Sequence, residues 1–297
     1  MRKVNMKSLV VGMGIGQLYK SILETAGHTV VTVDQDPNKN ADFVSLTQAL
    51  SEHPLFDTAH VCTPNFTHFK LADTVAAHAR IVFVEKPGVT TAAKWQELVE
   101  SHPGTRIVMV KNNQWRPEFG MFKEYYGKTD EIWLRWINKN RVPNPGTWFT
   151  TKETAFGGVS RDLLPHLLSY ATGFCGGFNQ LKVVYKDYTQ RWTLDDVADT
   201  DYGTVDKTGV YNVDDRAELI LEGFGKTFHL IADWRSNDTT DIGIAFGDHG
   251  SAHRFELGLC PEEAYLAMIK DCIENLNNAE FWANQLKQDL WIHEMME

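Results

Sequence analysis

The chain has 297 residues, enough for two domains, and its 43% hydrophobic and 23% charged residues are typical of an ordinary globular protein. Its formal net charge of −10 argues against a nucleic-acid-binding protein, which needs a basic surface. No apolar stretch approaches the roughly 20 residues of a membrane-spanning helix, and the first residues lack the pattern of a signal peptide. We therefore expect a cytoplasmic protein that binds neither nucleic acid nor membranes.

The first third of the chain alternates strand and helix patterns. Apolar runs rich in β-branched residues predict strands, and helical periodicity predicts helices between them. Nearly continuous apolar strands that alternate with helices predict an α/β fold, a parallel sheet with helices on both faces. The expected strands are 7–11, 28–33, 41–44, 58–62, 81–84 and 106–110, and the expected helices are 17–26, 47–52, 67–79 and 92–101.

The pattern changes near Pro117 and predicts an α+β domain with a large, mostly antiparallel sheet. Gly247-Asp248-His249-Gly250 predicts a hairpin turn between the last two strands. We therefore divide the chain into a first domain over 1–117 and a second over 118–297. The expected strands of the second are 131–138, 180–188, 216–221, 227–234, 242–246 and 252–257, and its helices are 118–126, 163–171, 261–275 and 279–296.

A glycine-rich turn, Gly12-Met13-Gly14-Ile15-Gly16, joins the first expected strand to the first helix. Strand, glycine turn and helix together are typical of a nucleotide site, in which a pyrophosphate lies on the helix N-terminus. The third glycine comes one residue before its usual place at Gln17, so a simple tight turn is the alternative. The pattern predicts a doubly wound, Rossmann-type domain.

Asp34 ends the second expected strand about twenty residues after the glycine turn, where a carboxylate accepts a hydrogen bond from the ribose 2′-hydroxyl. The same carboxylate repels a 2′-phosphate, which favours NAD over NADP. The alternative is that Asp34 only begins a turn into Asp36-Pro37.

Lys86, in Glu85-Lys86-Pro87, follows the apolar run 81–84. Open α/β sheets bind ligands at the carboxyl ends of their strands, where a lysine polarises a substrate oxygen or moves its proton. The segment Cys62-Thr63-Pro64-Asn65-Phe66-Thr67-His68 follows the preceding strand. Either it borders the cofactor, or Asn65 or Thr67 only caps the next helix.

In this order, the motifs G-x-G-x-G, T-P-N-x-x-H and E-K-P resemble the glucose-fructose oxidoreductase, inositol dehydrogenase and MocA (Gfo/Idh/MocA) family of NAD(P)-dependent oxidoreductases. The segment from Gly157 to His166, GGVSRDLLPH, is similar to that family's G-G-x-x-x-D-x-G-x-H, with Leu164 in place of a glycine. The turn at 247–250 resembles the family's later G-x-x-G turn. The resemblance covers nearly the whole chain.

The resemblance implies a catalytic set of Lys86, Asp162 and His166, with His166 as the general acid/base. It implies that the same three residues contact the substrate, and the segment 112–117 resembles one at the family's domain junction. Asn113 or Arg116 therefore either borders the substrate or belongs to a polar hinge. The cofactor-binding residues that the resemblance implies are Gly12, Gly14, Ile15, Gly16, Asp34, Thr63, Pro64, Asn65, His68, Glu85 and Lys86.

Asp162 and His166 are four residues apart, so on one helix they would share a face. A carboxylate beside an imidazole fixes its tautomer and raises its pKa, which suits proton transfer near neutral pH. The alternatives are an exposed helix pair, or Asp162 as a cap with Pro165 in the first turn.

No metal site is expected. The four cysteines are scattered without C-x-x-C spacing, which predicts reduced thiols. His249 and His253 have the spacing of metal ligands on a helix, but the glycine between them and the expected hairpin argue against a site.

The strand 132–137 is rich in tryptophan and apolar on both faces, while helices are expected on only one face of the sheet. It is either simple core or the open face of the sheet, on which a second subunit packs in a homodimer or homotetramer.

We therefore expect an NAD-dependent dehydrogenase or reductase, with NADP the less favoured cofactor. It would act on the CH–OH group of a polyhydroxylated sugar, sugar derivative or cyclitol, and His166 or Lys86 would take the hydroxyl proton. The alternatives are a reductase of a carboxylated or unsaturated substrate, or a dinucleotide-binding sensor without turnover.

Overall fold

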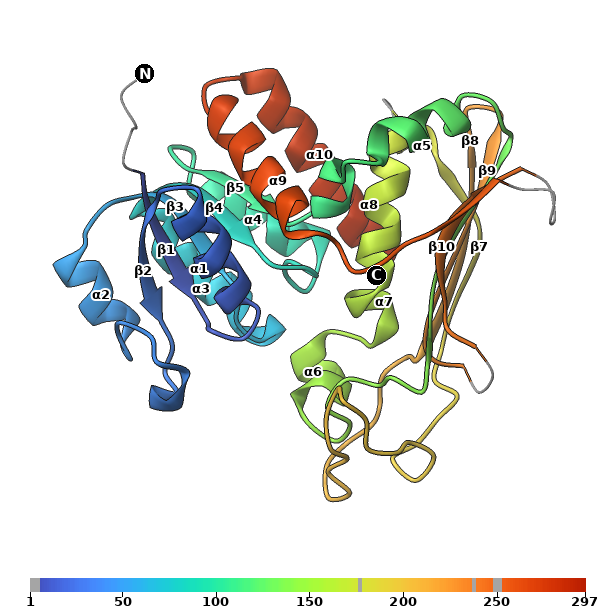
Figure 1. Cartoon of the computed structure of the whole chain (residues 1–297), viewed down its shortest axis with the longest axis horizontal. Helices are drawn as coiled ribbons and strands as arrows, with labels where there is room; N and C mark the ends of the chain where they lie inside the picture. The colour runs from blue at the N-terminus through green and yellow to red at the C-terminus, as the bar shows by residue number, and fades with distance from the viewer. Residues whose placement is uncertain (1–5, 176–177, 237–238, 248–252) are drawn as a thin grey trace. The chain divides into compact units, whose positions relative to one another are not determined.

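The computed structural model describes residues 6–175, 178–236, 239–247 and 253–297. The chain forms two compact units (Figure 1). The first unit combines Met1–Asn112 with Glu262–Met295 and Glu297, and the second contains Asn113–Pro261 and Met296. None of the helices in the described part of the chain is long and apolar enough to cross a membrane.

The first unit contains a five-stranded parallel sheet in the order β2-β1-β3-β4-β5. Its central strands are buried on both faces, because helices pack on each side. The predicted doubly wound sheet is confirmed. Its strands are β1 Lys7–Val11, β2 Thr29–Val33, β3 Phe56–Val61, β4 Ala79–Val84 and β5 Arg106–Met109, and the helices between them are α1 Gly16–Thr25, α2 Leu46–Glu52, α3 His68–Ala76 and α4 Ala92–Ser101.

The chain reverses its direction across the sheet between β1 and β3. The connection through α1 leads outward to β2, whereas those through α3 and α4 lead the other way, to β4 and β5. In a doubly wound sheet this reversal opens a crevice at the carboxyl ends of the strands, where ligands bind. The glycine turn and the segment after β3 both lie at these ends.

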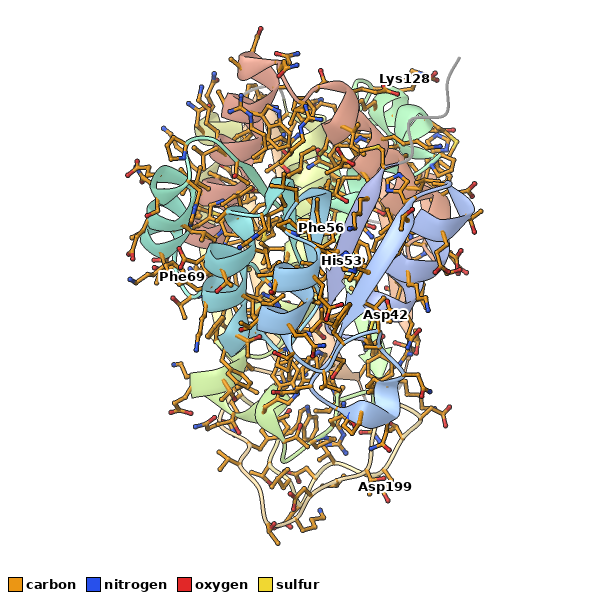
Figure 2. All side chains as sticks on the ribbon, turned by 90° about the vertical axis from the view of Figure 1, so that its left-hand side faces the viewer. Asp42, His53, Phe56, Phe69, Lys128 and Asp199 are labelled. Atoms are coloured by element: carbon orange, nitrogen blue, oxygen red, sulfur yellow. The ribbon has the colours of Figure 1, made fainter. Side chains whose placement is uncertain are left out.

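The expected strand 41–44 is not formed. Only Phe43 makes a bridge, to Val33 at the end of β2. The side chain of Asp42, labelled in Figure 2, accepts hydrogen bonds from the backbone N–H of Thr32 at 2.9 Å and its hydroxyl at 2.7 Å. The segment is thus joined to β2 by one backbone bridge and by the Asp42 side chain, which is too little pairing for a strand.

The two last helices, α9 Glu262–Glu274 and α10 Ala279–Met296, belong to the first unit. The division at residue 117 had placed them in the second domain. Instead, α9 packs against α1, and Asp289 of α10 accepts the backbone N–H of Met109 at 3.0 Å. Because β5 is the edge strand, this bond covers part of its open edge.

A buried ion pair also attaches α10 to the sheet. Lys111, just after β5, pairs with Asp289, and their side chains are 1% and 0% exposed. The Lys111 ammonium also donates to the carbonyl of Met109 at 3.2 Å. Burial raises the pKa of Asp289, while the lysine acts in the opposite direction.

The second unit contains a six-stranded sheet in the order β11-β10-β6-β9-β8-β7. Among its described strands only β6 and β9 pair in parallel, so the predicted mostly antiparallel sheet is confirmed. The strands are β6 Glu131–Lys139, β7 Lys182–Thr189, β8 Arg216–Gly223, β9 Lys226–Ser236, β10 Asp241–Phe246 and β11 His253–Glu256, and the helices are α5 Phe119–Tyr126, α6 Lys152–Ala155, α7 Val159–Asp162 and α8 Leu164–Phe174.

Short 3₁₀ helices complete the two units: η1 Pro37–Lys39, η2 Asn65–Thr67, η3 Asn112–Trp115, η4 Trp148–Thr150 and η5 Phe178–Gln180. The expected hairpin turn lies outside the described residues except for Gly247. His249, whose spacing from His253 is that of metal ligands on a helix, lies outside them as well.

Helix α8 packs on β6 and β9 through side chains that alternate along each strand. Ile132 and Leu134 of β6 are fully buried on this face. Trp133 and Arg135 alternate with them and therefore point to the opposite face, where the Trp133 ring stacks on His229 at 3.8 Å. Arg135 lies over the Trp133 ring and pairs with Asp241 at 3.3 Å, so this face combines aromatic and charged groups.

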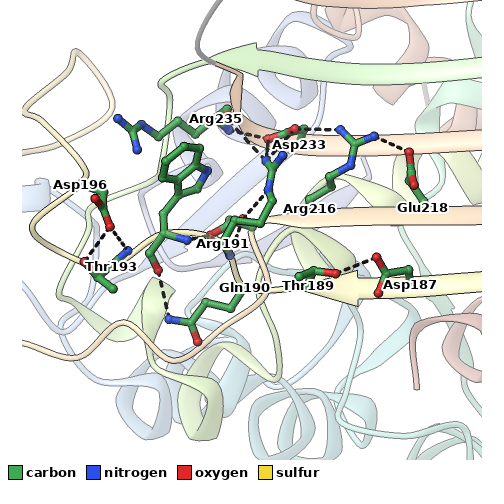
Figure 3. Close-up of polar contacts among 12 residues, drawn as sticks. Asp187, Thr189, Gln190, Arg191, Thr193, Asp196, Arg216, Glu218, Asp233 and Arg235 are labelled. Carbon is green, nitrogen blue, oxygen red and sulfur yellow. Dashed lines mark hydrogen bonds and ion pairs between the residues drawn. The ribbon is translucent and has the colours of Figure 1, made fainter.

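A second charged cluster lies beside the strand ends of the same sheet (Figure 3). Asp233 of β9, 2% exposed, receives Arg191 at 2.8 Å and Arg216 at 3.1 Å. Arg191 also bonds to Asp215 at 3.3 Å. Because Arg191 and Asp215 lie near the two ends of the β7–β8 connection, the cluster fastens this long segment to the sheet.

Candidate functional site

The glycine turn after β1 has a geometry that only glycine allows. Gly12 has φ +91°, and a Cβ there would lie 2.7 Å from the carbonyl oxygen of Cys62. Its N–H donates to the carbonyl of Val33 at 2.8 Å. The turn is therefore packed tightly between the ends of β2 and β3.

The other two glycines meet different surroundings. Nothing lies within 4 Å of a Cβ built on Gly14, whereas one built on Gly16 would lie 2.9 Å from Val10. Gly14 thus leaves room for a ligand to approach the backbone, and Gly16 lets α1 pack closely on β1. Although the third glycine comes one residue early, it has the packing role of the usual one. These residues fit a bound dinucleotide.

Asp34 closes the other side of the glycine turn. One carboxylate oxygen accepts the N–H of Met13 at 2.7 Å, and the other accepts the N–H of Asp36 at 2.9 Å. Both interpretations of Asp34 thus have structural support, because it begins the turn into Asp36 and also faces the glycine turn. An ionised carboxylate at this place suits a ribose diol.

The segment after β3 is held by hydroxyl and imidazole contacts. The hydroxyls of Thr63 and Thr67 lie 2.6 Å apart, and Thr67 donates to the carbonyl of Pro64 at 2.7 Å. The ring nitrogens of His68, which is 1% exposed, lie 2.7 Å from the carbonyl oxygen of Thr63 and 2.8 Å from that of Gly88. Burial lowers the pKa of His68.

His68 was expected to line the cofactor. Its ring instead joins the segment after β3 to the segment after β4. We call residues 85–89 the Lys86 loop, since they carry Glu85 and Lys86. The contacts of the His68 ring therefore attach the Lys86 loop to the segment after β3.

Glu85 is anchored in the same loop. Its carboxylate accepts the Tyr19 hydroxyl at 2.5 Å and the backbone N–H of Lys86 at 3.2 Å. Burial raises the pKa of Glu85, while the Tyr19 bond and the Lys86 charge act in the opposite direction. Tyr19 of α1 thus fixes the side chain that precedes the candidate catalytic lysine.

His293 of α10 holds the Lys86 loop from another side. Its Nε2 accepts the N–H of Val89 at 3.2 Å, while its Nδ1 donates to the carbonyl of Asp289 at 2.7 Å. The peptide between Gly88 and Val89 is therefore bonded to two histidines, His68 at its carbonyl and His293 at its N–H. No sequence pattern predicted the role of His293, because a histidine near the end of a helix is equally compatible with solvent exposure.

In the second unit, one continuous helix does not carry both Asp162 and His166. Helix α7 ends at Asp162 and α8 begins at Leu164, with Pro165 in its first turn, so the expectation of one shared helix face was wrong. The carboxylate of Asp162 accepts the indole N–H of Trp234 at 2.9 Å. The His166 ring stacks on Trp136 at 5.1 Å.

Asn113 and Arg116 support His166. The Asn113 side-chain nitrogen lies 3.2 Å from His166 Nδ1, and its oxygen accepts Arg116 Nε at 3.3 Å and the Tyr170 hydroxyl at 3.4 Å. Arg116 is only 6% exposed, and it also donates to the carbonyl of Gly258 at 2.5 Å. Trp136 and Trp234 come from strands β6 and β9, far from His166 in sequence, while Tyr170 lies one turn after it on α8. None of the three belonged to a motif that predicted this contact.

The glycine pair 157–158 allows α7 to begin close to another segment. A Cβ on Gly158 would lie 1.8 Å from the carbonyl oxygen of Asp214. The Asp214 carboxylate accepts the N–H of Gly158 at 2.9 Å and that of Ser160 at 2.7 Å. The glycines and Asp214 together set the start of the short helix that ends at Asp162. Leu164, in place of the family's glycine, is fully buried.

Within the described part of the chain, no group of three or more histidine, cysteine, aspartate or glutamate side chains is arranged to hold a metal ion.

Sequence comparison matches residues 6–111 to a protein family and most of the chain to a relative. Residues 6–111 match the oxidoreductase family described as having an NAD-binding Rossmann fold, GFO_IDH_MocA. A provisional UDP-kanosamine synthase oxidoreductase subunit of Amycolatopsis mediterranei (strain S699) is 28% identical over 286 residues, covering 87% of this chain and 77% of the relative.

Solved structures share the fold of both units. GenD2 from gentamicin A biosynthesis, in complex with NAD, has a TM-score of 0.75 at 19% identity, over 98% of this chain and 92% of its own. Levoglucosan dehydrogenase with NADH and levoglucosan has a TM-score of 0.74 at 13% identity, over 97% of this chain and 95% of its own. A myo-inositol dehydrogenase from Corynebacterium glutamicum has a TM-score of 0.73 at 14% identity, over 99% of this chain and 95% of its own.

The glycine turn, the ordered motifs and these similarities agree. Residues 6–111 thus match the Gfo/Idh/MocA family of oxidoreductases and its NAD-binding Rossmann fold, and both units share the fold of solved structures.

Proposed function

We propose that the protein is an NAD-dependent dehydrogenase or reductase that acts on the CH–OH carbon of a sugar, sugar derivative or cyclitol. The observation that carries the proposal is the glycine turn of the first unit, with space over Gly14 and the Asp34 carboxylate beside it. The relatives support the substrate class, since two are named as dehydrogenases of levoglucosan and of myo-inositol.

Asp34 favours NAD over NADP. A 2′-phosphate beside its carboxylate would bring two negative charges together, whereas a 2′-hydroxyl donates a hydrogen bond to it. Because Asp34 is bonded to the backbone of Met13 and Asp36, it cannot turn away from a phosphate without breaking these bonds.

In the proposed reaction, the nicotinamide ring supplies the acceptor or donor of the hydride. Lys86 stabilises negative charge on the reacting oxygen. Asp162 and His166 bind substrate hydroxyls, and His166 or Lys86 exchanges the hydroxyl proton. The loop that carries Lys86 is held by Glu85, His68 and His293, which reduces the number of positions the amine can take.

The structure favours a neutral substrate over a carboxylated one. A carboxylated substrate would need a cation such as Arg116 or Lys86 as its anchor, and Arg116 is buried and bonded to Asn113 and Gly258. We further propose that the chain forms a homodimer or homotetramer through the sheet face that carries Trp133.

The test uses a panel of sugars and cyclitols with NAD, monitored by NADH absorbance. Lys86→Ala should lower kcat by at least about 100-fold, the typical contribution of one charge-stabilising group, and leave the Kd for NAD within about threefold. Lys94→Ala, on the exposed side of α4, is the control and should behave like the wild type. Unchanged kcat in Lys86→Ala would contradict the mechanism, and NAD binding without turnover of any compound would favour a sensor.

A further inference from the structure

We infer that His166 carries its proton on Nε2 and that Asn113 is the positioning residue that imposes this tautomer. The mechanistic meaning of the inference rests on the proposed function, but the tautomer itself does not. It follows from the contacts among Asn113, Arg116, Tyr170 and His166, all of which belong to the second unit.

The orientation of the Asn113 amide is fixed by its neighbours. Arg116 Nε can only donate a hydrogen bond, so the Asn113 atom 3.3 Å from it must be the oxygen. The Tyr170 hydroxyl donates to the same oxygen at 3.4 Å. Turning the amide over would place its NH₂ group against the guanidinium. Arg116 is in turn held by the carbonyl of Gly258 at 2.5 Å.

The amide orientation then decides the protonation of His166. The NH₂ group of Asn113 faces His166 Nδ1 at 3.2 Å, and an amide nitrogen cannot accept a hydrogen bond. Nδ1 must therefore be the acceptor and carry no proton. In a neutral imidazole the proton is then on Nε2.

The surroundings of the ring agree with this state. Trp136 of β6 stacks on it at 5.1 Å and offers no charge. Arg116 is bonded to the oxygen of Asn113, and the Asp162 carboxylate accepts the indole N–H of Trp234. An added proton on Nδ1 would face the N–H of Asn113 and lose this hydrogen bond.

The tautomer separates the two roles that the proposed reaction left open. Nε2–H of His166 can donate a hydrogen bond to a substrate oxygen, but it cannot take a proton from a substrate hydroxyl. In the oxidative direction the reaction would then need a second group, the Lys86 amine, to take the hydroxyl proton. His166 holds the oxygen in place and Lys86 exchanges its proton.

Nuclear magnetic resonance of the ¹⁵N-labelled full chain tests the tautomer without cofactor or substrate. Long-range ¹H–¹⁵N correlation distinguishes an unprotonated ring nitrogen from a protonated one, and His166→Gln assigns the signals. At a pH where the ring is neutral, we expect Nδ1 unprotonated and Nε2 protonated. Protonated Nδ1 in the wild type would overturn the inference.

Asn113→Asp is the informative variant, because it keeps the shape of the side chain. One carboxylate oxygen can still accept hydrogen bonds from Arg116 and Tyr170. The other takes the place of the NH₂ group, so an acceptor now faces Nδ1 where the wild type has a donor. At a pH where the ring is neutral, we expect its proton on Nδ1 and an unprotonated Nε2. Tyr170→Phe is the matched control, since Arg116 alone still orients the amide, and its His166 signals should match those of the wild type.

Kinetics then tests the role. In Asn113→Asp, the dependence of kcat on pH should gain an ionisation near neutrality, because the freed Nε2 can now accept a proton. A merely structural role for Asn113 would lower kcat equally at every pH, and that result would also overturn the inference. An inactive wild type with the expected tautomer would instead remove the proposed function and leave the tautomer standing.

Discussion

Gly12 and Gly14 are two residues apart, yet a methyl group added at each would meet different surroundings. At Gly12 it would collide with the Cys62 carbonyl in a backbone conformation that disfavours side chains. At Gly14 it would enter open space, the place proposed for the cofactor. One glycine thus serves the fold, and the other serves the ligand.

We predict that Gly12→Ala lowers the free energy of unfolding by about 2–3 kcal/mol, because strain and collision act together. Gly14→Ala should leave stability within about 0.5 kcal/mol and weaken NAD binding at least about tenfold. Thermal unfolding and calorimetric titration measure the two effects. Gly104→Ala, also in open space but away from the turn, is the control for both. Equal effects of the Gly12 and Gly14 substitutions on stability would count against this division of roles.

His60, buried in the central strand β3, makes stability depend on pH. Its ring stacks on Phe83 at 4.9 Å and bonds to the Thr58 hydroxyl at 3.0 Å. Burial lowers the pKa of His60 from 6.5 to about 3. Between these values the unfolded chain binds a proton that the folded chain does not, so stability falls as the pH decreases through this window.

We predict that lowering the pH from 7 to 5 costs the wild type about 2 kcal/mol more than His60→Gln, because one such group contributes about 1.4 kcal/mol per pH unit below 6.5. Urea unfolding at the two pH values measures the difference. His253→Gln, at an exposed position of β11, should retain the pH dependence of the wild type. If His60→Gln also retained it, the histidine would not be neutral in the folded protein.

The partner of His166 shows why side-chain contacts resist prediction. The spacing of Asp162 and His166 predicted a pair on one helix, but Pro165 starts a new helix between them. The residue that faces Nδ1 is Asn113, 53 positions earlier in the chain. Local spacing contains no information on a contact of that range, and the order of the motifs names candidate residues without their contacts.

At the scale of elements, apolar runs predicted the parallel strands because most of their residues are buried, although the run 41–44 does not form a strand. The same reasoning could not assign α9 and α10 to a unit. An amphipathic helix shows that one face must be covered, but not which sheet covers it. The bonds that decide the matter, from Asp289 to Met109 and Lys111, join residues far apart in the chain.

We predict that Asp289→Asn lowers the free energy of unfolding by about 3–5 kcal/mol, because it leaves the buried charge of Lys111 without its partner. Chemical denaturation measures the change. Glu280→Gln, at an exposed position in the first turn of α10, should cost at most about 0.5 kcal/mol. A loss as small as that in Asp289→Asn would mean that the ion pair does not attach α10 to the sheet.

At the scale of the whole molecule, the proposed oligomer depends on the sheet face that carries Trp133. Ile231 of β9 is adjacent to Arg135 in the register and lies on the same face. We predict that the wild type is larger than its 33.7 kDa monomer in light scattering after gel filtration, and that Ile231→Glu shifts it towards the monomer. Leu55→Glu, at a position 72% exposed in the first unit, should not change the mass. A monomeric wild type at micromolar concentration would remove the oligomer proposal.

The first unit combines an early segment of the chain with its last two helices, and this has a consequence for folding during synthesis. A ribosome releases residues 1–112 early, but their sheet still lacks Asp289 at its edge strand and His293 at the Lys86 loop. The second unit is almost entirely one continuous stretch, so nearly all of it leaves the ribosome before Asp289 and His293 are made. The first unit therefore cannot complete its folding until α10 has been translated. A product that ends before α10 would lack the hydrogen bond from His293 to the Lys86 loop.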